Sequence, residues 1–185
     1  MRLYCATSNP GKLREFIQIV GDVQPLPGIE NIPAPDEHGA TFEENAEAKA
    51  IYYSRFCDGP LFVDDSGLEV DALAGAPGIY SARYAGPEAT DQANNQLLLE
   101  KMRGETNRTA RFVCVVALAA HGELIKTFRG EVEGELLHAA RGSNGFGYDP
   151  LFYYPPFGCS FGEVSAERKM EVSHRARALR AMREF

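Results

Sequence analysis

Residues 61–67 read Leu-Phe-Val-Asp-Asp-Ser-Gly, an apolar run that passes directly into two acidic residues. Three large apolar residues in succession predict a short buried strand that ends in a turn at 64–67. Because side chains alternate along a strand, Asp64 and Asp65 are expected to point to opposite faces. Such a carboxylate pair suits a hard cation, so one member would bind metal or activate water while the other supports it. The alternative is an Asx-type turn with solvated carboxylates.

The sequence before this strand predicts alternating strand and helix. Residues 2–6 predict a buried strand, and a helix follows from about Lys12 because apolar side chains then recur at helical spacing. Thr41 and Glu44 match a capping box, with Thr41 as the N-cap of a helix that runs to about Phe56. This half of the chain therefore predicts an α/β arrangement.

The second half predicts antiparallel strands followed by helix. Two apolar runs, 111–120 and 124–128, flank the His-Gly dipeptide at 121–122, which is a hairpin signal. Residues 132–137 predict a third antiparallel strand. The chain then ends in a predicted helix over 165–185. The fold class is thus mixed α/β, with an antiparallel meander in the second half.

Composition favours one soluble cytoplasmic domain over 1–185. The 185 residues are 44% hydrophobic and 24% charged, which is ordinary for a globular protein. The net charge of −7 weighs against an extended nucleic-acid-binding face. No signal peptide is visible, and the longest apolar run, 112–120, is far too short for a membrane span. The 4 cysteines form no C-x-x-C pair and are expected to be reduced.

A candidate phosphate site lies at 7–12, Thr-Ser-Asn-Pro-Gly-Lys, where the first strand meets the first helix. Backbone N–H groups at a helix N-terminus, small hydroxyls and one lysine together suit a phosphate group. The segment is not a Walker A loop, because that motif needs a further glycine upstream of Gly11. The alternative is an ordinary strand–turn–helix corner.

Two later segments carry groups suited to a nucleotide base. In the glycine-rich loop 142–150, Phe146 offers a face for stacking and Asp149 can accept hydrogen bonds from ring N–H groups. Lys169 and residues 173–175, Ser-His-Arg, form a cationic cluster. The alternatives are a tight loop that closes a strand and a solvated helix face.

Several sequence blocks, in this order and spacing, resemble the Ham1/ITPase family of inosine triphosphate pyrophosphatases. The similarity covers nearly the whole chain, and the blocks Asp-Asp-Ser-Gly-Leu and Ser-Ala-Arg-Tyr-Ala-Gly are highly specific. The matching blocks are 6–9 with Lys12, 41–46 with 49–50, 64–68, 72–73, 75, 77–78, 80–86, 145–150 and 173–175.

The resemblance implies an elongated α/β fold with a mixed central sheet, flanking helices and two lobes with the active-site cleft between them. It implies a homodimer that needs Mg²⁺. The implied activity is hydrolysis of non-standard purine nucleoside triphosphates such as ITP, dITP and XTP to the monophosphate and pyrophosphate. Such an enzyme would remove these nucleotides from the cellular pool.

The resemblance also implies residue roles. The triphosphate would be held by Thr7, Ser8, Asn9, Pro10, Gly11 and Lys12. Asp65 would be the proton acceptor and the metal-linked carboxylate, and Ser66 would contact the substrate. The base would be surrounded by Phe146, Gly147, Tyr148, Asp149, Lys169, His174 and Arg175. Weaker candidates are Asp64 as the supporting carboxylate and Lys49 and Arg83 as phosphate contacts.

The loop before the second predicted helix departs from the family pattern. Many bacterial relatives carry an acidic residue directly after an Ile-Pro pair, whereas Ala34 follows that pair here. Asp36 and Glu37 come slightly later. A metal ligand from this loop is therefore left open.

Lys169, His174 and Arg175 cannot share one face of an unbroken helix. At about 100° per residue, His174 lies about 140° from Lys169, and Arg175 about 120° from it in the other direction. If all three surround the base, the helix must break near 172–173. Ser173 would then be the N-cap of the final helix. The alternative is one continuous helix with Lys169 in solvent.

Three other functions compete with this prediction. A Maf-type pyrophosphatase for pyrimidine or modified nucleotides is disfavoured by the Phe-Gly-Tyr-Asp loop and the C-terminal Ser-His-Arg. A nucleotide-binding module without turnover leaves Asp64 and Asp65 unexplained. An RNA-binding protein is disfavoured by the acidic charge balance.

Overall fold

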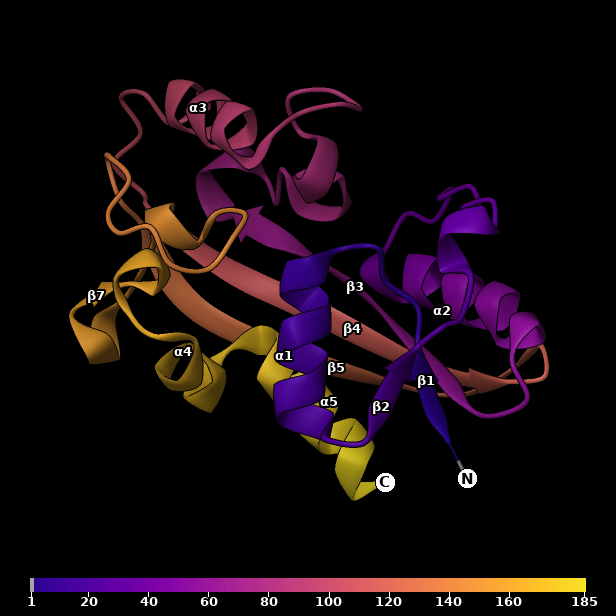
Figure 1. The fold of residues 1–185 in the computed structure, drawn as a ribbon. Coiled ribbons are helices and arrows are strands. Elements are labelled where there is room, and N and C mark those ends of the chain that lie inside the picture. Colours follow the sequence, from indigo (N-terminus) through magenta and orange to yellow (C-terminus); the bar gives the residue numbers. More distant parts are fainter. Residues whose placement is uncertain (1) are drawn as a thin grey trace. The chain divides into compact units, whose positions relative to one another are not determined.

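A computed structural model describes residues 2–185, which form one mixed sheet with flanking helices (Figure 1). The elements are β1 (Leu3–Cys5), α1 (Pro10–Val20), β2 (Val23–Pro25), α2 (Phe42–Tyr53), β3 (Leu61–Val70), α3 (Asp91–Lys101), β4 (Thr109–Ala120), β5 (Glu123–Leu136), β6 (Phe152–Tyr154), β7 (Cys159–Ser160), α4 (Ala166–Val172) and α5 (His174–Glu184). The strand order is β2-β1-β3-β4-β5-β6-β7. β1 is parallel to β2 and β3, whereas β6 is antiparallel to β5 and β7. The predicted mixed α/β class is confirmed.

The chain divides into two compact units. Unit 1 comprises the residues up to Asp65 together with 114–130 and 174–185, and unit 2 comprises 66–113 and 131–173. Each is described by itself below.

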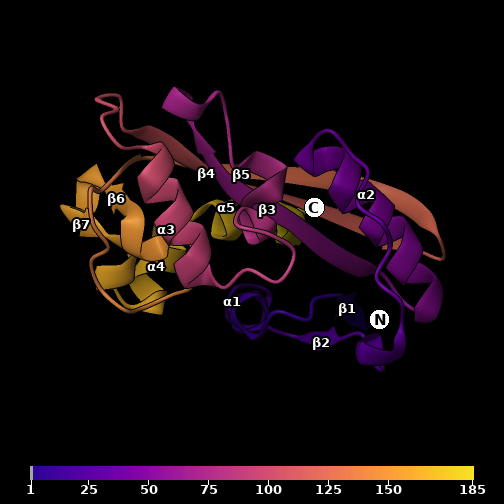
Figure 2. The same cartoon turned by 90° about the horizontal axis from the view of Figure 1, so that it is seen from above.

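In unit 1, β1 and β2 lie side by side and α1 packs against α5 (Figure 2). The Asn9 side chain caps α1 by accepting from the N–H groups of Gly11 and Lys12 at 2.8 and 3.1 Å. Thr41 caps α2, as predicted, by accepting from the Glu44 N–H at 3.1 Å. The two caps satisfy helix N–H groups that have no partner within the helix.

Unit 2 is built around aromatic packing. The ring centroids of Phe112 and Phe152 lie 4.5 Å apart, and those of Phe152 and Phe161 5.0 Å apart. Leu98 and Met102 anchor α3 in this core with almost no exposed surface. Burial of this apolar surface is the main force that holds α3 in place.

The predicted turn at 64–67 is wrong, because β3 continues without interruption to Val70. Leu68 and Val70 have no exposed surface, so the core of unit 2 holds this part of the chain extended. The predicted separate strand at 132–137 is also wrong. Those residues continue β5, in which Val132, Gly134 and Leu136 alternate with more exposed neighbours.

The predicted hairpin and the predicted C-terminal helix break are both confirmed. His121 and Gly122 have φ of 51° and 83°, the left-handed geometry of a tight turn, and they join β4 to β5. α4 ends at Val172, and Ser173 has extended backbone angles of φ −64° and ψ 154° before α5 begins. The Ser173 N–H still bonds to the Lys169 carbonyl at 3.0 Å, after which the hydrogen-bond pattern of α4 stops.

Candidate functional site

The corner at 7–12 is an exposed turn fixed by its own side chains. The Thr7 hydroxyl accepts from the Asn9 N–H at 3.1 Å, and Asn9 in turn caps α1. Ser8, Asn9 and Pro10 are exposed, whereas Gly11 is buried. Lys12 turns toward β3, where its Nζ donates to the Asp64 carboxylate at 2.9 Å. The corner thus presents a helix N-terminus and a lysine that is already positioned by a carboxylate.

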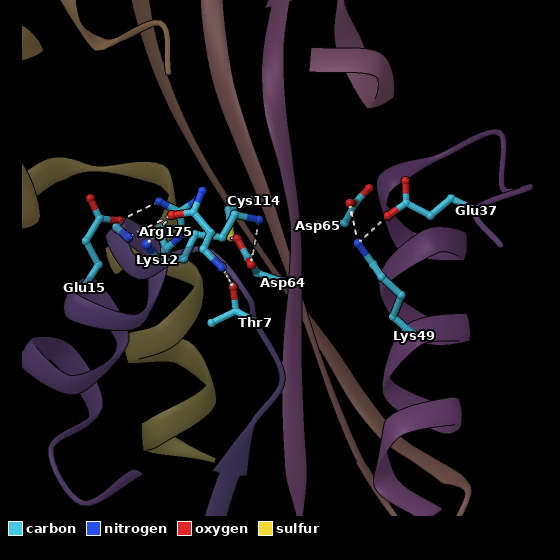
Figure 3. A network of polar contacts seen from close by, with 11 residues as sticks. Thr7, Lys12, Glu15, Glu37, Lys49, Asp64, Asp65, Cys114 and Arg175 are labelled. Carbon is cyan, nitrogen blue, oxygen red and sulfur yellow. Dashed lines mark hydrogen bonds and ion pairs between the residues drawn. The ribbon is translucent and has the colours of Figure 1, made fainter. Parts of the chain in front are cut away.

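Asp64 lies at the centre of a buried charge cluster in unit 1 (Figure 3). One of its oxygens accepts from Lys12, and the other accepts from Arg175 Nε at 3.1 Å. Arg175 also donates to Glu15 at 2.5 Å, and its own exposure is only 2%. Burial alone would raise the pKa of Asp64, but Lys12 and Arg175 outweigh that effect and hold the pKa well below its usual range. Asp64 is therefore a fixed anion.

Asp65 lies on the opposite side of β3, as the strand alternation predicts (Figure 3). Its Oδ1 accepts from Lys49 Nζ at 2.7 Å, and the same ammonium donates to Glu37 at 3.0 Å. Asp65 Oδ2 is buried and has no hydrogen-bond partner within residues 2–185. Burial raises the pKa of Asp65 in spite of the opposing attraction of Lys49. The pKa values of the two adjacent aspartates are thus shifted in opposite directions.

Glu37 and Glu15 belong to these clusters and were not assigned by the sequence analysis. Glu37 follows the Ile-Pro pair by a few residues, so the acidic composition of that loop was the available signal. Glu15 is buried on α1 with 7% exposure, and nothing in its local pattern distinguishes it from an ordinary helical glutamate. Its partner Arg175 is 160 residues away in the chain.

The glycine-rich loop of unit 2 is organised around Asp149. Its Oδ2 accepts from the Phe146 N–H at 3.0 Å and from Lys169 Nζ at 2.7 Å. The Lys169 ammonium also lies 4.8 Å from the centroid of the Phe146 ring. A side chain at Gly145, where φ is +73°, would collide with the Asp149 carboxylate. The loop therefore fixes an aromatic ring, a cation and a carboxylate next to one another.

Tyr148 and Ser81 tie the same loop to the interior of unit 2. The buried Tyr148 hydroxyl donates to the Ser81 carbonyl at 2.7 Å, and the Ser81 hydroxyl accepts from the Leu68 N–H at 2.9 Å. Arg83 lies over the Tyr80 ring, 5.4 Å from its centroid. Ser66 follows directly after Asp65 on β3 and is half-buried.

The site residues predicted from the sequence therefore fall into two groups. Unit 1 brings together Lys12, Asp64 and Arg175 on one side of β3 and Lys49 with Asp65 on the other. Unit 2 brings together Phe146, Asp149 and Lys169. Arg175, which the resemblance assigns to the base, pairs with Glu15 and Asp64, and His174 before it is buried.

The structure is thus an α/β protein with a lysine–carboxylate cluster beside a helix N-terminus in unit 1 and an aromatic loop with paired charges in unit 2. Comparison with known sequences agrees with this class. The model of the Ham1 family matches residues 3–185, and the chain belongs to that family.

Relatives match over nearly all of this chain and most of their own length. A curated dITP/XTP pyrophosphatase of Exiguobacterium sp. (strain AT1b) is 50% identical over 186 residues, which cover 98% of this chain and 95% of the relative. That of Syntrophobacter fumaroxidans is 50% identical over 188 residues, which cover 99% and 81%. The solved Staphylococcus aureus Ham1 protein superposes with a TM-score of 0.89 at 40% identity and covers 100% of this chain and 97% of its own.

Two kinds of site are absent from the described residues. Within residues 2–185, no three His, Cys, Asp or Glu side chains gather as potential metal ligands. None of the helices in that range is both long and apolar enough to cross a membrane.

Proposed function

We infer that the chain hydrolyses non-standard purine nucleoside triphosphates, such as dITP, ITP and XTP, to the monophosphate and pyrophosphate. Full-length similarity to curated dITP/XTP pyrophosphatases supports this activity. The structural observation that carries it is Asp65, whose Oδ1 is held by Lys49 while its buried Oδ2 has no partner among the described residues. That oxygen is suited to accept a proton or to meet a cation.

A divalent cation fits the residues of unit 1, and we propose Mg²⁺. Asp65 Oδ2 lacks a partner, and the carboxylate of Glu37 shares Lys49 with it. Mg²⁺ is typically held by one or two carboxylates together with water and substrate phosphates, so a larger protein cage is not needed. When bound, the ion would neutralise triphosphate charge and polarise a phosphoryl oxygen.

Asp65 is proposed as the proton acceptor for the attacking water. Because Lys49 fixes one carboxylate oxygen, the other is oriented before substrate arrives. Water attacks the α-phosphorus, its proton passes to Asp65, and pyrophosphate leaves without a covalent intermediate.

The turn at 7–12 is proposed to hold the triphosphate. The N-terminal end of α1 carries a partial positive charge, and Lys12 adds a full one. Asp64 holds the Lys12 ammonium at 2.9 Å and so limits the conformations of a flexible side chain. Lys12 would then contact phosphate from a prearranged position, which lowers the entropy lost on binding.

The loop of unit 2 is proposed to bind the base. Phe146 would stack on the purine, and Lys169 would donate to the 6-oxo group of hypoxanthine or xanthine. Adenine presents a 6-amino donor at the same place, so its binding would leave both donors unpaired. Asp149 can accept from a ring N–H. Substrate contacts by Ser66, Gly147, Tyr148, His174, Arg175 and Arg83 remain proposals of the same kind.

We further propose that the enzyme is a single-domain cytoplasmic homodimer that acts on free nucleotides and does not bind nucleic acid. The acidic net charge of −7 supports the last point. Sedimentation velocity of the purified protein would test the dimer.

The central experiment measures pyrophosphate and phosphate separately in a Mg²⁺-containing assay of dITP, ITP, XTP, GTP, ATP and dTTP. Pyrophosphate release from the first three, with loss of activity in chelator and recovery on adding Mg²⁺, is the expected result. Preferential hydrolysis of dTTP would favour a Maf-type enzyme instead. Tight dITP binding without pyrophosphate release would indicate a binding module.

A further inference from the structure

Helix α3 holds both backbone groups of Gly147, the residue that follows Phe146. The Gly147 N–H donates to Asp91 at 2.7 Å, and the Gly147 carbonyl accepts from the Asn95 side-chain amide at 3.0 Å. Asp91 and Asn95 are four residues apart and so lie on the same face of α3, one turn from each other.

Gly147 is a position where such a restraint matters. Its φ is +61°, and Gly145 on the other side of Phe146 has a φ of +73°. Glycine reaches this left-handed geometry without strain, but it also has more alternative conformations than any other residue. The backbone on both sides of Phe146 could therefore adopt several conformations if nothing restrained it. Asp149 holds the Phe146 N–H, and α3 holds Gly147.

Helix α3 is itself well anchored. Leu98 has no exposed surface and Met102 almost none, so one side of the helix is fixed in the core of unit 2. Asn94 is buried and bridges a second loop, because its amide accepts from the Ala85 N–H at 2.8 Å and donates to the Ala82 carbonyl at 3.1 Å. Within residues 2–185, the side chain of Asn95 bonds only to Gly147, and its amide oxygen has no partner.

We propose that Asp91 and Asn95 are positioning residues that fix the conformation of Gly147 and thereby the orientation of the Phe146 ring. The proposal rests on the proposed function in one respect, that Phe146 stacks on the base. Loss of either bond would let the glycine backbone leave the left-handed region. Base binding would then weaken, whereas groups that contact only phosphate would be unaffected.

The test uses Asn95→Ala and Asp91→Ala in the full chain. Gln96→Ala is the matched control, since Gln96 is exposed on the same helix and its side chain bonds only to Glu100 of that helix among the described residues. Asp91→Asn is a conservative rescue, because it removes the charge at the start of α3 but keeps an oxygen that can accept from Gly147. The first readout is hydrogen–deuterium exchange of a peptide that contains residue 147. We expect faster exchange in both alanine variants and unchanged exchange in Gln96→Ala and Asp91→Asn.

The second readout is the steady-state kinetics of dITP hydrolysis. Loss of one hydrogen bond should raise KM by roughly threefold to tenfold, while kcat changes by less than about twofold. Affinity for inorganic tripolyphosphate, measured as competitive inhibition, should not change. In a Phe146→Ala background, Asn95→Ala should raise KM no further, because the ring that it positions is absent.

The outcomes separate this proposal from the proposed function. Unchanged exchange at residue 147 in both alanine variants would overturn the restraint by α3. Faster exchange with an unchanged KM, in an enzyme whose KM does rise in Phe146→Ala, would overturn its role in base binding. If Phe146→Ala itself leaves KM unchanged, the stacking role of Phe146 fails, and the exchange result still decides whether α3 holds Gly147. Equal effects on tripolyphosphate and dITP would indicate general destabilisation and would also overturn the proposal.

Discussion

Replacing Arg175 by methionine tests whether the buried charge cluster of unit 1 stabilises the fold. The guanidinium is 2% exposed and pairs with Asp64 and Glu15, which are 5% and 7% exposed. Removing one partner of a buried ion pair costs about 3–5 kcal/mol, because a charge is left in a poorly solvated place. Lys12 still pairs with Asp64, so we expect the lower end, about 3 kcal/mol. For a chain of this size, that loss lowers Tm by about 6–12 °C.

The pH dependence of this loss has a definite sign. In the wild-type chain, the pKa of Asp64 lies below its usual value of 3.8, so its contribution to stability is present above that pH and is lost as the pH falls further. Without Arg175 the pKa of Asp64 rises, and protonation then relieves the buried charge. The Tm difference between wild type and variant should therefore be largest near pH 7 and shrink toward pH 4. Calorimetry in the presence of a chelator measures it.

The double variant Glu15→Gln/Arg175→Met provides the control for Arg175→Met. Arg175→Met leaves the carboxylates of Asp64 and Glu15 without their guanidinium partner, and the neutral amide at position 15 removes one of these two charges. The double variant should therefore be more stable than Arg175→Met alone. A Tm within about 2 °C of wild type for Arg175→Met, together with a raised KM for dITP, would refute the reasoning. That combination would mean that Arg175 serves the base and not the cluster.

Three further changes test other parts of the molecule. Asp65→Asn keeps the volume of the side chain but removes its charge, so kcat for dITP should fall by about 10²–10⁴-fold with little change in Tm. A kcat near that of the wild type would contradict the assignment of Asp65 as the base. Phe146→Ala should raise KM more than it lowers kcat, at a cost of about 1–3 kcal/mol of binding, and an unchanged KM would place the ring in the core. Gly130→Ala should lower the free energy of unfolding by about 1–3 kcal/mol, because the new methyl group would meet the carbonyl of His174 and lie 2.7 Å from the Ala178 backbone nitrogen. Denaturant unfolding measures this loss, and an unchanged free energy of unfolding would mean that α5 moves aside at no cost.

Local geometry accounts for the parts of the site that the sequence predicts well. Strand alternation places Asp64 and Asp65 on opposite faces, and the structure confirms it. Helix periodicity requires a break before His174 if Lys169, His174 and Arg175 all surround the base, as the resemblance implies, and the extended backbone of Ser173 provides a break there. The first argument depends only on neighbouring residues, whereas the second also uses the residue roles that the resemblance implies.

The parts that the sequence did not predict depend on distant residues. Ser66 and Gly67 have the composition of a turn, yet the burial of Leu68 keeps the strand extended. The strands β6 and β7 are 3 and 2 residues long, too short to show a pattern. The pairing of Arg175 with Glu15 joins residues from opposite ends of the chain, and no local signal marks it.

Because β3 runs unbroken through both aspartates, an insertion just before them and a deletion at the same place would have different effects on the two charged sites. A one-residue shift of a strand exchanges the faces of all later side chains. Deleting one residue would bring Asp65 to the buried cations Lys12 and Arg175, and the serine after it to Lys49, so the charge cluster would persist while the base is lost. Inserting one residue would bring Asp64 to Lys49 and so remove from Lys12 and Arg175 the aspartate that they share, while Arg175 would still pair with Glu15. The doubled aspartate thus keeps a carboxylate beside the buried cations in a shortened strand, and a carboxylate beside Lys49 in a lengthened one.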